Sequence, residues 1–451
     1  MHLVLRQAVE QAGFWAAWFI IPAFFELLKA MRAWGRNRFV PTEYPGYVYP
    51  GRMPRITILV PIFNSAGTLG QCLRSIANST YPNELINVIC ANNQSMDNSR
   101  RVFQLLQDEL SDLPMQWLET SHGKAQALNT AIYTSTGDYV VTLDSDATLE
   151  KHALMNVIRN FVTHPDMQAQ TGIILINRKL MQSPGRFTKQ HRFFHLNEYL
   201  EYMVTFLAGR TFESHRDQLF TMSGAFSAFR RSALMQSRLF NVNTVGEDTD
   251  ITFQIRYNLN GQVVLCPSAV CYVEPAASWD DLYVQRQRWQ RGEIEVVKNF
   301  FQDRLSLKAV GQNFLIRRLL VDHTMALLKG IWLVAPVIML GVGISLPVIL
   351  TVILMIYGLY LLIAIFNLSN VVQYLRFQPE EQRYVKRRWW LIFTLPVYDL
   401  MVSYFRLIGI LNVTYRPAVW NTVSLSQENA AIQRIIRQDI QRFKDGLKKE
   451  R

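Results

Sequence analysis

The sequence predicts an α/β domain with a parallel, doubly wound sheet, flanked on both sides by transmembrane helices. Two observations predict this class. From about Val40 to Phe300, short β-branched apolar runs alternate with segments of helical periodicity, an order typical of parallel sheets. Outside that region lie long apolar stretches, and residues 330–368 contain no charged side chain at all. A run of that length is long enough to cross a bilayer, which takes about 20 mostly apolar residues.

The central region opens with four predicted strands, at Arg55–Pro61, Ile86–Cys90, Gln116–Glu119 and Tyr139–Leu143. Helices are predicted between them, at Gly67–Asn78, Asn98–Glu109 and Ala125–Tyr133. Polar side chains follow the strand ends, namely Asn64, residues 92–97 and Asp144. Ligands of doubly wound sheets bind outside the carboxyl ends of the strands, so these side chains are expected to converge on one crevice.

Three apolar regions predict the membrane part of a multi-pass cell-membrane protein. One crossing is expected near Phe14–Leu28, two across roughly Thr324–Leu368 with a turn near Gly341–Pro347, and one at Trp389–Leu411. The alternatives are buried core helices, or a signal peptide for the first region, although no clear cleavage pattern follows it. Lys and Arg residues flank these regions and positive residues stay in the cytosol, so the central domain is expected to be cytosolic.

The C-terminal tail conflicts with this topology. Four crossings put the tail outside the cell, yet the residues after Trp420 are strongly basic. Either Trp389–Leu411 does not cross fully, or the tail departs from the charge rule. The expected divisions are an N-terminal helix with its basic flank (1–39), the α/β domain (40–300), an interfacial segment (301–320), the C-terminal helices (321–416) and the basic tail (417–451).

Charge and cysteine content indicate which binding partners and which cysteine chemistry to expect. The chain carries 47 Lys and Arg against 35 Asp and Glu, a net charge of +12. The positive charges gather beside the apolar regions, which indicates contact with membrane lipids, and no aromatic-interleaved basic stripe indicates nucleic acid. The four cysteines show no CxxC spacing, so reduced thiols are expected rather than disulfides or zinc.

The segment Asp144-Ser145-Asp146 is a candidate metal site. It ends an apolar strand, and alternate residues of an extended chain point the same way, so both carboxylates can face one pocket. Two converging carboxylates suit a divalent cation that bridges phosphate oxygens. The competing interpretation is a solvated turn or a helix cap.

Two further segments suggest chemistry. Glu247 and Asp248 open a helical stretch, although acidic residues favour helix N-termini for electrostatic reasons alone. Gln285, Arg288 and Trp289 fall at positions i, i+3 and i+4, hence on one helix face. An arginine can bind a diphosphate in bidentate fashion, and a tryptophan offers a flat face to a sugar ring. The alternative is an amphipathic helix at the membrane surface.

Taken together, the segments resemble the D, DxD, (T)ED, QxxRW series of processive family 2 glycosyltransferases, which include cellulose, hyaluronan, chitin and poly-N-acetylglucosamine synthases. The resemblance covers about Arg55–Gly292, and within the family the chain looks most like Gram-positive transferases associated with exosortase systems. The matching segments, in order, are Pro61-Ile-Phe-Asn64, Asn92-Asn-Gln-Ser-Met-Asp97, Gly123-Lys124, Ala127-Leu128-Asn129, Asp144-Ser-Asp146, Ser223-Gly224-Ala-Phe, Glu247-Asp248 and Gln285-x-x-Arg288-Trp289.

The resemblance implies a GT-A type, Rossmann-like catalytic domain and a role for each matching residue. Asp248 would be the general base, and Asp146, with Asp144, would hold Mg²⁺ or Mn²⁺ on the diphosphate of a nucleotide-sugar donor. The implied donor-binding residues are Phe63, Asn64, Asn92, Lys124, Asp144, Gln285 and Arg288. The implied acceptor-binding residues are Trp289, Glu247, Ser223 and Gly224. The acceptor would be a carbohydrate or a lipid-linked sugar, and accessory membrane subunits stay open.

The chain departs from the family at two positions. Asn92 stands where the family usually has the Asp that contacts the uracil edge, so UDP as the donor nucleotide becomes less certain, although an amide still donates and accepts hydrogen bonds. Ser65 stands where an acidic residue is common.

Other polar residues have a simpler explanation. His191 and His195 are spaced like a metal pair, but they lie in an aromatic-rich stretch without a third ligand, which favours a surface helix. Asp399 and Arg406 are costly in lipid, so they are expected to line a sugar path or to be paired. Three function classes remain: a synthase that extends a β-linked polysaccharide, a transferase that places one sugar on a lipid carrier, and a non-catalytic membrane scaffold.

Overall fold

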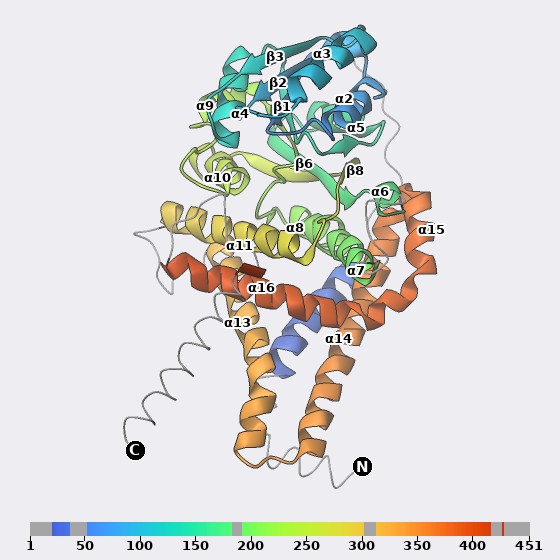
Figure 1. Cartoon of the computed structure of the whole chain (residues 1–451), viewed down its shortest axis with the longest axis vertical. Coiled ribbons are helices and arrows are strands. Elements are labelled where there is room, and N and C mark those ends of the chain that lie inside the picture. The colour runs from blue at the N-terminus through green and yellow to red at the C-terminus, as the bar shows by residue number, and fades with distance from the viewer. Residues whose placement is uncertain (1–19, 37–51, 183–191, 302–312, 416–425, 428–451) are drawn as a thin grey trace, which may run out of the picture.

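A computed structural model of the chain describes residues 20–36, 52–182, 192–301, 313–415 and 426–427 (Figure 1). Its upper part is an eight-stranded sheet in the order β3-β2-β1-β4-β7-β6-β8-β5. All four strands expected from the sequence are present, as β1 (Ile56–Ile62), β2 (Ile86–Asn92), β3 (Met115–Glu119) and β4 (Tyr139–Leu143). The other four are β5 (Thr148–Leu149), β6 (Met167–Ile176), β7 (Phe226–Arg230) and β8 (Gln262–Val273).

The sheet is mixed, so the expectation of a wholly parallel sheet is wrong. β3, β2, β1 and β4 are parallel as expected, but β7 runs antiparallel to both β4 and β6. β7 enters the sheet beside the carboxyl end of β4, where Phe226 pairs with Leu143, and therefore runs back along it. The parallel half is the half in which polar side chains meet at one edge.

Side chains of successive strand residues alternate between two apolar layers. Ile56, Ile58, Val60 and Ile62 of β1 pack with α2 (Leu69–Ala77), α3 (Ser99–Glu109) and α5 (Ala153–Thr163). Leu59 points to the other face, against α4 (Lys124–Thr134), α9 (Arg231–Gln236) and α10 (Glu247–Phe253). Each such aliphatic side chain contributes roughly 1.5–3 kcal/mol when fully buried, and together the two layers fix the strand ends that carry the polar residues.

A layer of helices lies below the sheet in Figure 1 and joins it to the helical hairpin underneath. It contains α7 (Arg192–Tyr202), the π-helical turn Met203–Gly209, α8 (Arg210–Ser214) and α11 (Trp279–Phe301). α6 (Arg178–Gln182) and α15 (Pro379–Arg387) lie at one side, and α16 (Leu395–Tyr415) runs beside α11 (Figure 1).

The hairpin expected from the uncharged run is formed by α13 (Phe314–Gly341) and α14 (Leu346–Tyr374), with the turn inside the expected range. Among the described residues, α14 is long and apolar enough to cross a membrane. α13 is a second such helix if its two parts, bent by 45° near Trp332, count as one span. Pro336 lies inside α13, and its ring excludes the carbonyl four residues earlier, at Trp332, which accounts for the bend.

The segment Trp389–Leu411 does not form a helix of that kind. A 3₁₀ turn covers Trp389–Phe393, and α16 then runs across the axis of the hairpin rather than along it (Figure 1). α16 is held to α11 by Asn412, which donates to Gln287 at 3.0 Å, and by the close approach of Gly409, whose added Cβ would lie 3.2 Å from the Gln287 Cα atom. Among the described residues, this segment therefore contributes no helix that is long and apolar enough to cross a membrane.

The N-terminal apolar region is described only in part, as a helix over residues 20–36, and Phe14–Phe19 lie outside the described residues. The helix packs on α14 through Ala23, Ala30, Tyr360 and Ile363. Glu26 forms an ion pair with Lys329 of α13 at 2.8 Å.

Candidate active site

One side of the candidate site is built at the carboxyl end of β4. Asp144 follows this strand, and Lys124 is the first residue of α4. The Lys124 Nζ atom lies 2.6 Å from Asp144 Oδ1, 3.7 Å from Glu247 Oε1 and 3.5 Å from the carbonyl oxygen of Gly224. Burial lowers the pKa of the Lys124 amine, but Asp144 and Glu247 raise it by more, so the amine stays charged. One lysine thus joins three of the segments singled out in the sequence.

The two carboxylates of the Asp144–Asp146 pair face one cavity, as expected. Burial and the neighbouring Asp144 carboxylate raise the pKa of Asp146 to about 6. This is the behaviour of two acids that repel each other and that a nearby cation would stabilise. The described residues contain no group of three or more His, Cys, Asp or Glu that could hold a metal, so a divalent cation here would complete its shell with oxygens of the donor or of water. The pair fits Mg²⁺ or Mn²⁺ on those terms.

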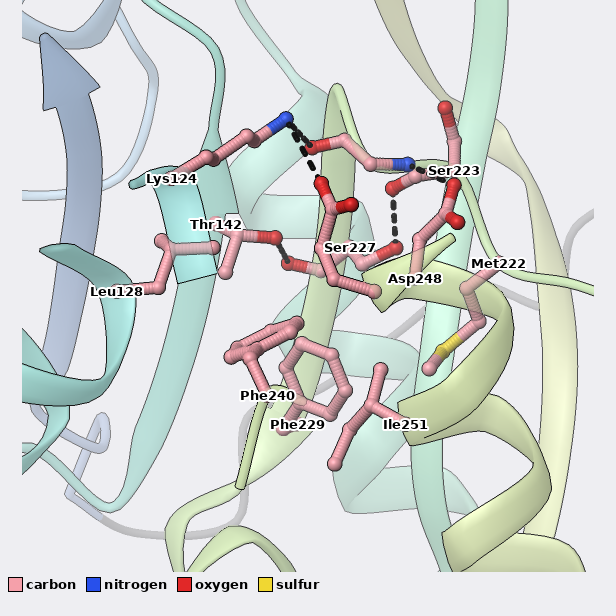
Figure 2. Close-up of a pocket in the computed structure, with 12 residues that line it drawn as sticks. Lys124, Leu128, Thr142, Met222, Ser223, Ser227, Phe229, Phe240, Asp248 and Ile251 are labelled. Carbon is pink, nitrogen blue, oxygen red and sulfur yellow. Dashed lines mark hydrogen bonds and ion pairs between the residues drawn. The ribbon is translucent and has the colours of Figure 1, made fainter. Parts of the chain in front are cut away.

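Asp248 is held in place by backbone amides. Its Oδ2 atom accepts from the Gly224 amide at 3.1 Å, and its Oδ1 atom accepts from the Thr249 amide at 2.7 Å. Figure 2 shows Asp248 and Lys124 on either side of the loop that carries Ser223, above an apolar floor of Leu128, Phe229, Phe240 and Ile251. A side chain at Gly224 would fill the space between Asp248 and Lys124, at 3.4 and 3.5 Å from their polar atoms. Glu247 is buried and lines the same cavity, and burial raises its pKa.

The helix α11 carries the QxxRW segment, with Gln285, Arg288 and Trp289 all lining the same cavity as Asp248. The Trp289 ring packs edge-on against Phe206 at 5.6 Å between centroids, and the Arg286 guanidinium lies 4.3 Å from the Trp289 ring centre. Arg286 is itself fixed by an ion pair with Glu201 at 2.7 Å. Sequence reasoning missed Arg286, because its role depends on an acid 85 positions away.

The structure does not bring Asn92 to the cavity. The Asn92 Nδ2 atom donates to Glu119 Oε2 at 2.6 Å, and its Oδ1 atom accepts from the Ser95 amide at 3.0 Å. The neighbouring Asn93 lines the cavity instead, where its side-chain oxygen accepts from the Gly123 amide. The sequence predicted nucleotide contact for Asn92 because Asn92 aligns with the Asp of the family pattern.

Phe63 and Asn64 lie at the cavity edge as expected. Asn64 has a positive φ of 51° and is held by hydrogen bonds to Ser95 and Met96. Ser65, the other departure from the family, shares a hydrogen bond of 2.7 Å with Ser145, the residue between the two aspartates. It therefore supports the Asp144–Asp146 turn.

One cavity of about 1630 Å³ connects these groups. It begins at Asn64 and Asp144, passes Asp248 and Trp289, and extends to α13, α14, α16 and the helix of residues 20–36. Asp399 and Arg406 both line it, and the Arg406 Nε atom donates to Gln290 of α11 at 2.8 Å. The two charges of the last apolar segment therefore face a cavity, as the cost of exposing them to lipid led us to expect.

The histidine pair gives no metal site. His191 lies outside the described residues, and His195 is buried beside Glu198, with 3.8 Å between the nearest nitrogen and oxygen. The surface-helix interpretation is wrong for His195, because α7 is covered by the helical layer around it.

Comparison with known proteins places this geometry in a family. Residues 54–292 match the family described as glycosyltransferase like family 2. The chain is 24% identical over 260 residues to a probable glycosyltransferase of Bacillus subtilis, a match that covers 57% of this chain and 59% of that protein. It is 23% identical over 295 residues to a poly-β-1,6-N-acetyl-D-glucosamine synthase of Staphylococcus epidermidis, covering 65% of this chain and 66% of the other. The chain thus spans about three fifths to two thirds of the length of these relatives.

Among solved structures, the fold is similar to that of a mannosyltransferase from Pyrobaculum calidifontis in complex with GDP-mannose and Mn²⁺. The TM-score is 0.58 at 17% identity, and the similarity covers 87% of this chain and 98% of that one. The chain therefore belongs to glycosyltransferase family 2, and it is a glycosyltransferase with a GT-A-like fold.

Proposed function

We propose that the protein is a membrane-bound, inverting glycosyltransferase that transfers sugar from a nucleotide-sugar, with UDP as the expected nucleotide, to a growing polysaccharide. The observation that carries the proposal is the single cavity that joins the Asp144–Asp146 pair, Asp248 and Trp289 to the helical hairpin. A donor at one end and a chain end at the other would meet beside Asp248. Similarity to poly-N-acetylglucosamine synthases supports a polymeric product.

The proposed mechanism assigns one task to each side chain. Asp248, oriented by the Gly224 and Thr249 amides, takes the proton of the acceptor hydroxyl as that oxygen attacks the sugar. Arg288 and Gln285 hold the donor diphosphate, Lys124 lies beside it, and the Trp289 ring supports the acceptor sugar. A Mg²⁺ or Mn²⁺ ion bound by Asp144 and Asp146 would neutralise charge on the leaving diphosphate.

A second candidate function is transfer of one sugar to a lipid carrier. It is favoured by the same cavity, because its far end is lined by α13 and α14, the helices with the most membrane-like composition. A lipid-linked acceptor would enter from the bilayer along this path, and no polymer would be needed.

Release of nucleoside diphosphate by the purified full chain, measured across a panel of nucleotide-sugars, tests the transferase proposal. One donor should support release that depends on added acceptor, and UDP-sugars should exceed GDP- and dTDP-sugars. Preference for a GDP-sugar would overturn the nucleotide assignment and leave the family unchanged.

Product length separates the two candidates. With excess donor and little enzyme, a processive synthase makes long chains while most acceptor stays unextended. Trp289→Ala should shorten these chains, whereas Trp289→Phe, which keeps a ring against Phe206, should retain more of their length. A single glycolipid whose size does not change as donor rises would contradict the polymer proposal and support the lipid carrier.

A further inference from the structure

Arg210 is a buried cation that lacks an anionic partner among the described residues. It is the first residue of α8, directly after the π-helical turn Met203–Gly209, and the residue is only 9% exposed. The guanidinium lies over the Phe206 ring at 4.6 Å, and its Nη1 atom is buried without a hydrogen-bond partner. Burial lowers the pKa of Arg210 to about 10, so it is charged at neutral pH.

Two other arginines that line the same cavity are neutralised. Arg286 forms an ion pair with Glu201 at 2.7 Å, and Arg318 forms one with Glu213, also at 2.7 Å. A buried charge without a partner is costly, and buried arginines are ordinarily paired for this reason. The difference between Arg210 and these two residues therefore indicates that an anion from outside the chain completes the environment of Arg210.

The position of Arg210 shows which substrate the anion belongs to. Arg210 lines the active-site cavity, and the carboxylates that act most strongly on it are Asp248 and then Glu213. It lies over Phe206, which is also the ring that supports Trp289. These are the base and the platform proposed for the acceptor, whereas the donor phosphates are assigned to Arg288 and to the Asp144–Asp146 pair.

We propose that the acceptor carries an anionic group, a phosphate or a carboxylate, which Arg210 binds close to the reacting hydroxyl. This inference rests on the proposed function and deepens it by adding a chemical class to the acceptor. Planar bidentate binding of either anion is the contact for which a guanidinium is suited. A phosphate would come from a lipid carrier in the part of the cavity beside α13 and α14, and a carboxylate from an acidic sugar of the chain.

Binding measurements on the full chain in nanodiscs of neutral phosphatidylcholine test the inference. The donor site is first filled with nucleoside diphosphate and Mn²⁺, and farnesyl phosphate is then compared with farnesol, and glucuronate with glucose. The wild type should bind one anionic probe more tightly than its neutral counterpart, and Arg210→Gln should reduce that preference roughly tenfold to a hundredfold. Arg210→Lys should keep part of it. The probe that shows the preference identifies the source of the anion.

Stability gives a second readout that needs no substrate. Because Arg210→Met removes an unpaired buried charge, the variant should unfold at the same or a higher temperature than wild type in the absence of ligand. Arg256→Met is the matched control. The Arg256 side chain is also only 8% exposed, but it lies outside the cavity and is bonded to Asp217 and to the Val263 carbonyl, so its loss should lower the unfolding temperature. A comparable fall for Arg210→Met would mean that Arg210 is structural and would overturn the inference.

Two binding outcomes would also overturn it. If the wild type binds anionic and neutral probes with equal affinity, the acceptor site does not recognise an anionic group. Arg210→Gln could instead lose as much affinity for nucleoside diphosphate as Arg288→Gln loses. That result would show that Arg210 binds the donor and not the acceptor. In either case acceptor-dependent nucleotide release would persist in the wild type, so failure of this inference is distinct from failure of the proposed function.

Discussion

The two halves of the active site are built in different ways. The half proposed for the donor consists of the carboxyl ends of β1, β2 and β4 with Lys124, joined by Gln285 and Arg288 of α11. The half proposed for the acceptor consists of α8, the π-helical turn, Trp289 of α11 and α16. In the donor half, contacts such as Lys124–Asp144 and Ser65–Ser145 are made by residues that follow strands of one sheet. In the acceptor half, partners come from distant segments: Arg406 and Gln290 are 116 residues apart, and Tyr398 and Glu201 are 197 apart.

Substitutions in the two halves should have different effects on activity, binding and stability. The donor half is positioned by a close-packed sheet, whose buried strands tolerate little movement. The acceptor half is positioned where α16 docks on α11, so its geometry depends on a helix from the C-terminal part of the chain. Substitutions in the donor half should therefore act on chemistry and donor binding, and those in the acceptor half on stability and acceptor binding.

The largest expected effect comes from removal of the metal. If Asp144 and Asp146 hold a divalent cation, EDTA should stop turnover, and Mg²⁺ or Mn²⁺ should restore it, because the cation neutralises charge on the leaving diphosphate. The measurement is nucleotide release before and after chelation. Full activity in chelator would show that Asp144 and Asp146 hold no essential metal and form only a turn.

Asp248→Asn is the next largest change. It removes general-base catalysis, so turnover should fall by roughly 10²–10⁴-fold while nucleoside diphosphate affinity stays within about twofold. Asp250→Asn is the control, since Asp250 lies on the same helix but bonds to Gln254 and Asn241 away from the cavity. Near-normal transfer by Asp248→Asn would remove Asp248 from the mechanism and show that another group accepts the proton of the acceptor hydroxyl.

Glu293 tests the acceptor half through its pH dependence. Burial raises the pKa of Glu293 to about 7 from an ordinary 4.5. Between these two values the folded chain holds a proton that the unfolded chain has released, so the stability from that proton is complete below about pH 4.5 and is lost as the pH rises through 7. Glu293→Gln should remove this loss, which is on the order of 1–3 kcal/mol.

The control for Glu293 is Glu295→Gln on the same helix, whose side chain accepts from Thr244 and does not line the cavity. That variant should keep the wild-type dependence of unfolding free energy on pH. If Glu293→Gln and wild type showed parallel curves, the acceptor half would be more open to water than its burial implies.

The smallest expected effect is a change in nucleotide preference, which should differ between substitutions of Asn92 and Asn93. Competition of UDP, GDP and dTDP should change in Asn93→Asp, because Asn93 lines the cavity. Asn92→Asp would instead put a second carboxylate against Glu119, so we expect lower stability and a change of at most a few-fold in nucleotide preference. A strong gain in UDP preference from Asn92→Asp alone would restore the assignment made from the family pattern.

The sequence by itself determined the parallel half of the sheet, the helix that carries Gln285, Arg288 and Trp289, and the hairpin of α13 and α14. Each is set by local periodicity or by an apolar run, and both signals are contained within the segment itself. The convergence of Asn64 with the Asp144–Asp146 pair was also predictable, because parallel strands bring their carboxyl ends to one edge.

Only the tertiary structure decided the direction of β7, the position of α16 along α11, the presence of Asn93 rather than Asn92 in the cavity lining, and the lack of an ion pair for Arg210 among the described residues. None of these depends on a residue's own neighbours in sequence. The direction of β7 follows from the point at which the chain re-enters the sheet, and the position of α16 from packing as close as Gly409 against Gln287. Whether a buried arginine is paired depends on which acids the fold brings near it, and long-range packing alone determines that.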